Sequence, residues 1–274
     1  MPVTVAAPDM KEVCRKAKMR LEEVNSFLDL VKHAMEPFSQ RIGVIESGVL
    51  RYYAVERRGL GILKTRFGKF WHYSFAIDDQ WGEYSAIVKA ELDEELLIPV
   101  FRNKKRLVLR TDSGCETGQV FGDKTCECSP QLKKTMKLLS TLDEGMIISI
   151  PRQDGRGMGL TFKLATLWIQ QKFHVDTVKS AALLAPGGVI DVRTYSGVVG
   201  ILRFFGIPET CKINLATNNP EKAAIFGENG YTVNGHTPIV IKPTRDTRAH
   251  LRAKQEHLGH KGLVKERKGK DEHK

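Results

Sequence analysis

The hydrophobic positions near the N-terminus follow the period of a helix. The apolar side chains recur at alternating spacings of four and three residues, which is the pattern of a heptad seam. Asp9 with Glu12 three residues later resembles a capping box, and Pro37 ends the pattern. We therefore predict one helix over residues 9–36 with one buried face, covered either by the body of the protein or by a second copy. The seam consists of Met10, Cys14, Ala17, Leu21, Val24, Leu28, Val31 and Met35.

From about residue 50 the pattern changes to strands, and then strands alternate with helices. Segments rich in aromatic and β-branched residues predict strands. Segments with a period near 3.6 residues predict helices. The predicted strands are 51–56, 69–77, 84–92, 106–112, 145–151 and 212–217, and the predicted helices are 130–142, 160–173, 192–206 and 220–230. This order indicates an α/β (mixed α+β) body in which helices pack on a mixed sheet.

Length and composition narrow the class of protein. The chain has 274 residues, of which 41% are hydrophobic, enough for a sizeable core. No stretch approaches the roughly eighteen apolar residues of a membrane span. The first residues carry charges where a signal peptide needs an apolar run. We therefore expect a cytoplasmic protein with no membrane partner.

The positive charge is concentrated at the C-terminal end. The formal net charge is +11, and residues 241–274 hold eleven Lys/Arg against five Asp/Glu, so +6 lies there and +5 elsewhere. The last residues, 261–274, are typical of a basic disordered tail, and a nucleic-acid-binding arm is the alternative. The remaining charge suits a phosphate-bearing substrate. We expect no nucleic-acid partner.

Three of the five cysteines, Cys115, Cys126 and Cys128, stand close together in the chain. An odd count with this spacing is a poor basis for a disulfide framework, and it indicates a metal site. Cys126 and Cys128 can share one ion only where the chain turns, and Gly122 and Pro130 mark a loop there. Thiolates are common ligands of zinc.

The number of ligands decides what such a zinc site does. Structural sites are closed by four protein ligands, whereas catalytic sites keep one position for water. The sequence has no second cysteine knuckle. We therefore expect an open site that holds water. A structural site closed by Asp112 or by a distant histidine, and a cluster without metal, stay as alternatives.

Three further segments suit phosphate binding. Residues 152–160, RQDGRGMGL, follow a predicted strand and precede a helix. Either their N–H groups approach an anion, or they form a tight turn with Arg152 and Arg156 facing solvent. Asn219 explains the next helix start as an ordinary N-cap, but Lys222 in the first turn opposes the helix dipole unless an anion is near. Asp191 with Arg193 is either a helix N-cap or a base beside a phosphate clamp.

Together these motifs resemble the GTP cyclohydrolase II family of riboflavin synthesis. The cysteines match its zinc motif at its own spacing. RQDGRGMGL is similar to its R-Q-E-G-R-x-x-G-L, DVR to its D-x-R and TNNPEK to its T-N-N-P-x-K. The resemblance indicates an N-terminal helical extension (1–57), a catalytic domain with the family's fold (58–260) and the basic tail (261–274). The second catalytic domain of many bacterial members, which makes dihydroxybutanone phosphate, is not expected.

The resemblance implies an enzyme that needs zinc and magnesium and acts on GTP. Members remove C8 of guanine as formate and the two outer phosphates as pyrophosphate. By the resemblance, the three cysteines hold one zinc ion and Asp191 accepts a proton. Arg193 stays protonated and is expected to stabilise charge at phosphorus. We also expect a homodimer. The implied nucleotide contacts are Arg110, Ser113, Gln131, Asp154, Gly155, Arg156, Thr177, Thr217 and Lys222.

The chain departs from the family pattern at several of these positions. Where the family reads H-S-E-C-L-T-G-D, residues 112–119 read D-S-G-C-E-T-G-Q. Asp154 replaces the glutamate expected to recognise the guanine edge, and Leu167 replaces a tyrosine. Two end points therefore stay open for GTP: formate release, or a formylated, ring-opened product. A paralogue acting on another nucleotide, for example in pyrimidine catabolism, is a second hypothesis. The third is a non-catalytic zinc-containing nucleic-acid-binding protein.

Overall fold

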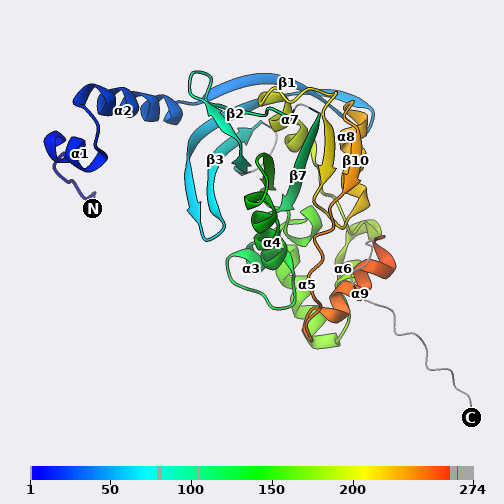
Figure 1. Ribbon diagram of the computed structural model, residues 1–274. Helices are drawn as coiled ribbons and strands as arrows, with labels where there is room; N and C mark the ends of the chain where they lie inside the picture. The colour runs from blue at the N-terminus through cyan, green and yellow to red at the C-terminus, as the bar shows by residue number, and fades with distance from the viewer. Residues whose placement is uncertain (1, 79–81, 104, 260–263, 265–274) are drawn as a thin grey trace, which may run out of the picture.

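One large curled sheet forms the centre of the molecule (Figure 1). The computed structural model describes residues 2–78, 82–103, 105–259 and 264. In that part of the chain, eight strands pair in the order β1-β2-β3-β4-β8-β7-β9-β10, and β5 pairs with β6. The strands are β1 Phe38–Glu46, β2 Val49–Thr65, β3 Gly68–Ile77, β4 Tyr84–Lys89, β5 Glu91–Asp93, β6 Ile98–Val100, β7 Arg106–Ser113, β8 Gly145–Ile150, β9 Lys212–Leu215 and β10 Val233–His236.

The sheet is mixed, as the sequence predicts. The run from β1 to β4 and on to β8 is antiparallel. By contrast, β7 is parallel to both β8 and β9, and β10 is parallel to β9. The carboxyl ends of β7, β8 and β9 therefore meet at one edge.

Helices cover both faces of the sheet and its carboxyl edge. The α-helices are α1 Met10–Ala17, α2 Leu21–Met35, α3 Glu116–Gln119, α4 Cys128–Ser140, α5 Gly159–Phe173, α6 Thr177–Leu184, α7 Ser196–Phe204, α8 Ala224–Glu228 and α9 Arg248–His257. Three 3-10 turns are η1 Asp154–Gly157, η2 Pro186–Gly188 and η3 Pro220–Ala223. Helices α5, α6 and α9 lie together beyond β7 (Figure 1). None of the described helices is long and apolar enough to cross a bilayer.

Burial on both faces explains the continuous apolar run of β8. Neighbouring residues of a strand point to opposite faces. Ile148 and Ile150 belong to the main core, which also contains α7 and α8. Ile147 points the other way and packs with Phe70 of β3 and Leu139 of α4 in a smaller cluster. A strand buried on both faces loses the apolar-polar alternation that marks a half-exposed strand.

The prediction of one continuous helix over residues 9–36 is wrong, because the chain forms two helices, α1 and α2, in this range. Asp9 caps α1 as expected, and its carboxylate accepts from the N–H of Lys11 at 3.0 Å. Lys18 then adopts a left-handed conformation, with φ of 56°, and ends α1. Glu23 reaches back to the N–H of Arg20 at 2.7 Å and starts α2. Capping by neighbouring residues therefore separates the two helices. No glycine marks this break in the sequence.

Other boundaries differ from the prediction for similar local reasons. The strand expected over 84–92 ends at Lys89, and the chain then enters the separate β5–β6 ribbon. The helix expected over 192–206 starts at Ser196. Strand β1 was not predicted, and it lies with the first part of β2 inside the range 1–57 expected to be helical. The division into domains stays a prediction, and the tail lies outside the described residues apart from Val264.

Candidate active site

Three parallel strands deliver the predicted site residues to one edge of the sheet. Strand β7 ends at Ser113 and leads to Cys115, and β8 leads through a short loop to Asp154. Strand β9 ends next to β7 and leads to Thr217. Ligands of α/β sheets commonly bind outside the carboxyl ends of the strands. The candidate site lies at this edge.

The three cysteines meet as the sequence predicts. Their sulfur atoms all lie within 4.8 Å of one another. The distance between Cys115 Sγ and Cys126 Sγ is 3.7 Å. Tetrahedral zinc with bonds of about 2.3 Å would separate two sulfurs by about 3.8 Å. Cys115 precedes α3, and Cys128 opens α4 after a turn. The donor set and its spacing therefore fit one zinc ion.

Gly118 of α3 makes the close approach of these sulfurs feasible. A Cβ at this position would lie 2.4 Å from Cys126 Sγ and 3.3 Å from Cys115 Sγ. Such a contact is far inside the van der Waals distance, so any side chain here would displace a ligand. Only glycine provides the space.

The three thiols lie close enough to perturb one another. Hydrogen bonds from Cys126 and Cys128 lower the pKa of Cys115. The hydrogen bond with Cys115, together with burial, raises the pKa of Cys126 to about 11, and hydrogen bonds with both other thiols raise that of Cys128 well above its usual range. A divalent cation binds the thiolate form, so its binding here would release protons.

The structure shows where the two candidates for a fourth protein ligand, Asp112 and a histidine, lie. Asp112 is buried, and its carboxylate accepts from Arg110 at 2.8 Å and from Gln119 at 2.6 Å. In the described part of the chain, the group of potential ligands around these sulfurs ends at the three cysteines. His250 is the histidine that lines the same cavity. Neither Asp112 nor His250 is part of this group of potential ligands, and the open site stays a prediction.

A cavity of about 100 Å³ lies beside the cysteines. The predicted residues that line it are Ser113, Cys115, Cys126, Cys128, Asp154, Gly155, Arg156, Thr177 and Arg193. Predicted residues that are not part of its lining are Arg110, Gln131, Asp191, Thr217 and Lys222. The lining residues that were not predicted are Gln153, Phe162, Lys163, Thr166, Ala181, His250 and Lys254.

Asp154 is a buried carboxylate with an unused oxygen. Its Oδ2 accepts from the N–H of Glu116 at 3.4 Å, while its Oδ1 has no hydrogen-bond partner among the residues that the structure describes. Burial, with the charge of Cys115, raises the pKa of Asp154 to about 6. The following turn presents its backbone to the cavity with left-handed residues, φ of 58° at Gly155 and 61° at Arg156. A buried acceptor that its described neighbours leave unsatisfied is suited to the polar edge of a ligand.

Two arginines give the cavity a positive wall. Arg156 donates to the carbonyl and the hydroxyl of Thr177 at 3.4 and 3.3 Å. Arg193 donates to the Asp191 carboxylate from Nε at 2.9 Å and also from Nη2. Burial and the charge of Arg193 lower the pKa of Arg156. Gly157 allows the segments that carry Arg156 and Arg193 to pack closely, since a Cβ there would lie 3.0 Å from the backbone nitrogen of Arg193. An anion would relieve the repulsion between these cations.

The N-cap interpretation of Asp191 is wrong. Helix α7 starts only at Ser196, five residues later in the chain. The carboxylate instead accepts from the backbone N–H of Arg193 at 3.2 Å and from its guanidinium. By contrast, the N-cap interpretation of Asn219 is confirmed, since its side chain accepts from the N–H of Glu221 at 3.0 Å.

A second cationic group lies near the carboxyl ends of β7 and β9. Lys222 is buried and donates to the Thr111 carbonyl at 2.7 Å. Burial, with the charges of Arg110 and Arg193, lowers the pKa of Lys222 to about 7. Arg110 also donates to the Ala216 carbonyl at 3.3 Å. These cations lie near enough to Arg193 to influence one another, yet outside the cavity lining.

Helix α9 supplies functional candidates that the sequence analysis missed. Lys254 donates to the buried Glu127 carboxylate at 2.6 Å, and Glu127 stands between two of the cysteines. Burial, with the charge of Lys254, lowers the pKa of His250 well below its usual range. Both α9 residues line the cavity. Their four-residue spacing on a helix was the available signal, but it did not indicate what that face contacts.

Leu167 does not fill the place of a cavity residue. On α5 the cavity is lined by Phe162, Lys163 and Thr166, and Leu167 is not part of the lining. The neighbouring Trp168 is 78% exposed. Neither side chain therefore supplies a polar group to the cavity.

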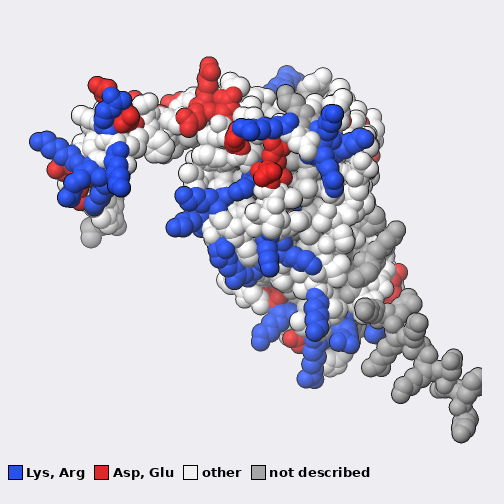
Figure 2. Space-filling view, in the orientation of Figure 1, with Lys and Arg blue, Asp and Glu red and all other residues white. Residues whose placement is uncertain are grey.

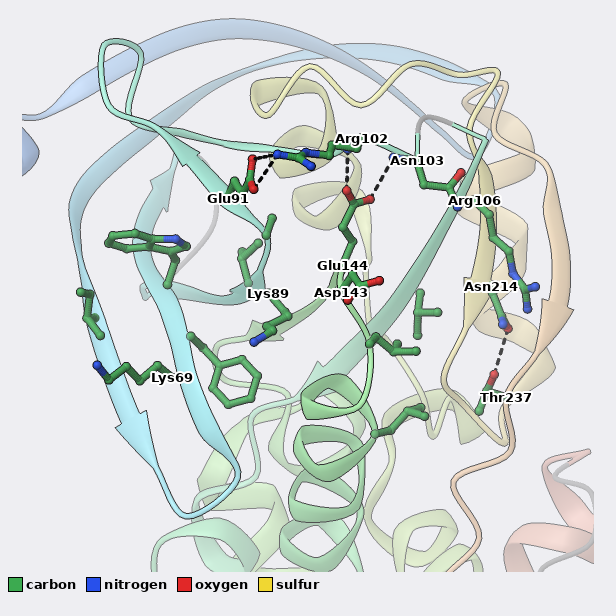
Figure 3. Close-up of a pocket in the computed structure, with 18 residues that line it drawn as sticks. Lys69, Lys89, Glu91, Arg102, Asn103, Arg106, Asp143, Glu144, Asn214 and Thr237 are labelled. Atoms are coloured by element: carbon green, nitrogen blue, oxygen red, sulfur yellow. Dashed lines mark hydrogen bonds and ion pairs between the residues drawn. The ribbon is translucent and has the colours of Figure 1, made fainter.

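A larger hollow of about 1000 Å³ lies on the α4 face of the sheet (Figure 3). Arg102 and Glu91 form an ion pair at its rim at 2.6 Å. The Glu144 carboxylate accepts from the backbone N–H groups of Arg102 and Asn103. Its lining contains no predicted site residue. The chemistry of the smaller cavity, and not volume, therefore identifies the candidate site.

Comparison with known proteins gives a family match. The family model described as GTP cyclohydrolase II matches residues 39–238. The GTP cyclohydrolase-2 of Picrophilus torridus is 34% identical over 198 residues, 72% of this chain and 94% of that protein. The GTP cyclohydrolase-2 of Streptomyces coelicolor is 30% identical over 222 residues, 81% of this chain and 93% of that protein. The riboflavin biosynthesis protein RibBA of Endomicrobium trichonymphae is 32% identical, and the match spans 45% of it.

Proposed function

Because the chain belongs to the GTP cyclohydrolase II family, we propose that it is a zinc-dependent hydrolase that opens the purine ring of GTP at C8 in riboflavin biosynthesis. The observation that carries the proposal is the trio of cysteines in one cavity with Asp154, Arg156 and Arg193. The cysteines suit a metal, the carboxylate suits a base edge and the arginines suit phosphates.

The cysteines would hold the zinc ion. When bound, zinc with three thiolates and an open position acts as a Lewis acid and lowers the pKa of water. Asp154 would accept from the N–H groups at the guanine edge through Oδ1, the oxygen without a hydrogen-bond partner in the described part of the chain. Because aspartate is shorter than the family's glutamate, guanine must sit closer to the turn η1. We therefore expect this substitution to affect the choice of base more than any other property of the site.

The phosphates would lie against the cationic wall. Arg156 and Arg193 provide forked donors suited to phosphate oxygens, and magnesium would accompany the outer phosphates. Asp191 would accept the proton that the attacking water loses. In the free protein the Arg193 guanidinium occupies this carboxylate, and bound nucleotide would draw the guanidinium away. Lys222 and Arg110 do not line the cavity and would stabilise the phosphate charge at longer range, together with Thr217 and Gln131.

The reaction has two successive hydrolyses at C8, and the second needs a group that orients water. Position 167, a tyrosine in the family, is leucine here and lies outside the cavity lining, so this chain offers no such hydroxyl from that position. Water first opens the ring to a formamide, and a second water then releases formate. A tyrosine hydroxyl can orient that water, whereas leucine has no donor or acceptor. We therefore propose that the formylated, ring-opened product accumulates.

One incubation tests both parts. The zinc-loaded protein is given each common nucleoside triphosphate with magnesium, and products are read by mass together with formate and pyrophosphate. Pyrophosphate from GTP with little formate supports the proposal. Equal formate and pyrophosphate would refute the Leu167 argument alone, and turnover of a different nucleotide would refute GTP as substrate. Cys126→Ser is the control, since it is expected to lose zinc and turnover together.

Three further expectations stay predictions: a homodimer, a cytoplasmic location and the absence of a nucleic-acid partner. The last is separable from catalysis, because nucleic-acid binding through the basic tail would weaken steeply with salt. Turnover of GTP by a chain shortened before the tail would support the enzyme hypothesis.

A further inference from the structure

A buried ion pair lies in the strand that leads to Cys115. Figure 2 shows Lys, Arg, Asp and Glu side chains at the surface of one face of the molecule. Arg110 and Asp112 of β7 are instead only 5% and 1% exposed. The Arg110 guanidinium donates to Oδ1 of Asp112 from Nε at 3.0 Å and from Nη2 at 2.8 Å. Burying two charges costs hydration free energy, and these contacts offset that cost.

The other oxygen of Asp112 closes a short loop around Cys115. Gln119, the last residue of α3, donates from Nε2 to Oδ2 of Asp112 at 2.6 Å. The loop between these two residues contains Cys115 and also Gly118, the position that leaves space for Cys126 Sγ. The hydrogen bond therefore holds the end of α3 against β7, and with it the place where two of the three thiols meet.

Arg110 extends this network to the helix of the third cysteine. Its Nη2 also donates to Oε1 of Gln131 at 3.4 Å, in the first turn of α4, and α4 begins at Cys128. Its Nη1 donates to the carbonyl of Ala216, directly after β9, at 3.3 Å. One buried ion pair thus connects β7 with α3, with α4 and with the segment after β9. Buried polar networks whose members are satisfied hold their surroundings in one arrangement.

The two side chains that meet at 2.6 Å are also two departures from the family pattern. By the resemblance, position 112 is a histidine and position 119 a carboxylate, whereas this chain has Asp112 and Gln119. The acid and the donor have changed places. A carboxylate at both positions would set like charges together, and a carboxylate at neither would leave the Arg110 charge buried without compensation. The contact keeps one acid and one donor because both positions differ.

We propose that Asp112 and Gln119 are positioning residues for the cysteine cluster, and that the two departures compensate each other. This inference rests on the proposed zinc site. The Asp112 oxygens already accept three hydrogen bonds, so its carboxylate holds the loop that carries the ligands and leaves the ion to the cysteines. Neither side chain lines the cavity. The pair therefore acts through the ligands and not on the nucleotide.

Moving the acid between the two positions tests the pair with nearly unchanged side-chain sizes. The variants are Asp112→Asn, Gln119→Glu and the double variant of the full chain. Zinc affinity is measured by competition with a chelator, and cobalt substitution reports thiolate geometry. Asp112→Asn leaves Arg110 without its carboxylate, and Gln119→Glu sets two carboxylates together.

Each single variant is expected to lose about 10–100-fold in zinc affinity, as changes behind metal ligands do, and to alter the cobalt spectrum. The double variant is expected to bind zinc more tightly than either single variant and to recover the parent's spectrum. Glu116→Gln is the matched control, because it removes one negative charge from an exposed side chain of the same helix. It is expected to keep the parent's zinc affinity.

Single variants that bind zinc as tightly as the parent would overturn the inference, as would an equal loss in Glu116→Gln. A double variant that binds no more tightly than the better single variant would overturn it too. Failure of a single variant to fold counts as loss of zinc, and rescue of that fold by the second change supports the pair. A parent chain that holds no zinc would instead refute the proposed metal site, and this inference with it.

Discussion

Gly118→Ala is the sharpest perturbation that the cysteine cluster allows. The new methyl group would lie 2.4 Å from Cys126 Sγ, whereas ordinary contacts begin at 3.4 Å, so the two atoms must separate by 1.0 Å. Ligand positions in metal sites tolerate only about 0.2 Å. The required shift is about five times that tolerance. Since changes behind the ligands already cost about 10–100-fold in metal affinity, we expect at least that loss here.

Zinc retention is the discriminating readout for this variant. Alanine is preferred over glycine in a helix by about 1 kcal/mol, but the contact with Cys126 Sγ opposes that gain with or without metal. We expect loss of zinc and of turnover while the circular dichroism spectrum is kept.

The assay is zinc content after dialysis against a graded chelator, with cobalt substitution to report thiolate coordination. Gly227→Ala is the matched control, because that glycine lies on the exposed side of helix α8 with nothing within 4 Å of its added Cβ. It is expected to keep zinc and activity. A Gly118→Ala protein with one tightly held zinc per chain and the parent's turnover would refute the reasoning.

Three more outcomes follow from the site. Asp191→Asn is expected to keep zinc and bind nucleotide but to lose about 10²–10⁴-fold in turnover, since it removes a positioned base; unchanged turnover would exclude the role. Lys254→Met leaves Glu127 buried and unpaired, so we expect a loss of about 3–5 kcal/mol in unfolding free energy and weaker zinc retention, measured by denaturant titration and metal analysis, with exposed Lys172→Met as control. The pKa of Lys222 is lowered to about 7, so above that pH the free protein has lost this charge and phosphate must restore it. Calorimetry in buffers of different ionisation heat is then expected to detect proton uptake on nucleotide binding, and Lys222→Arg to abolish it.

The sequence by itself determined the features that short stretches of chain encode. The spacing of Cys115, Cys126 and Cys128 sets which thiols can reach one ion, because ten residues and a turn are a short tether. The central strands and helices were predictable because their apolar period matches the side-chain period of each element. Capping by Asp9 and Asn219 was predictable for the same reason, since each cap bonds within three residues.

Only the tertiary structure decided which distant segments meet. The pairing of Lys254 with Glu127 joins residues 127 positions apart, and no local pattern encodes it. Asp191 reads locally as a helix cap, yet its carboxylate belongs to Arg193, because the helix starts later and the segment packs against Gly157. The apolar seam of α2 predicts a buried face. Whether the body covers that face depends on where the chain turns into β1, which the sequence does not specify. Side-chain chemistry is local, whereas burial and partners are set by contacts between segments that the chain order does not specify.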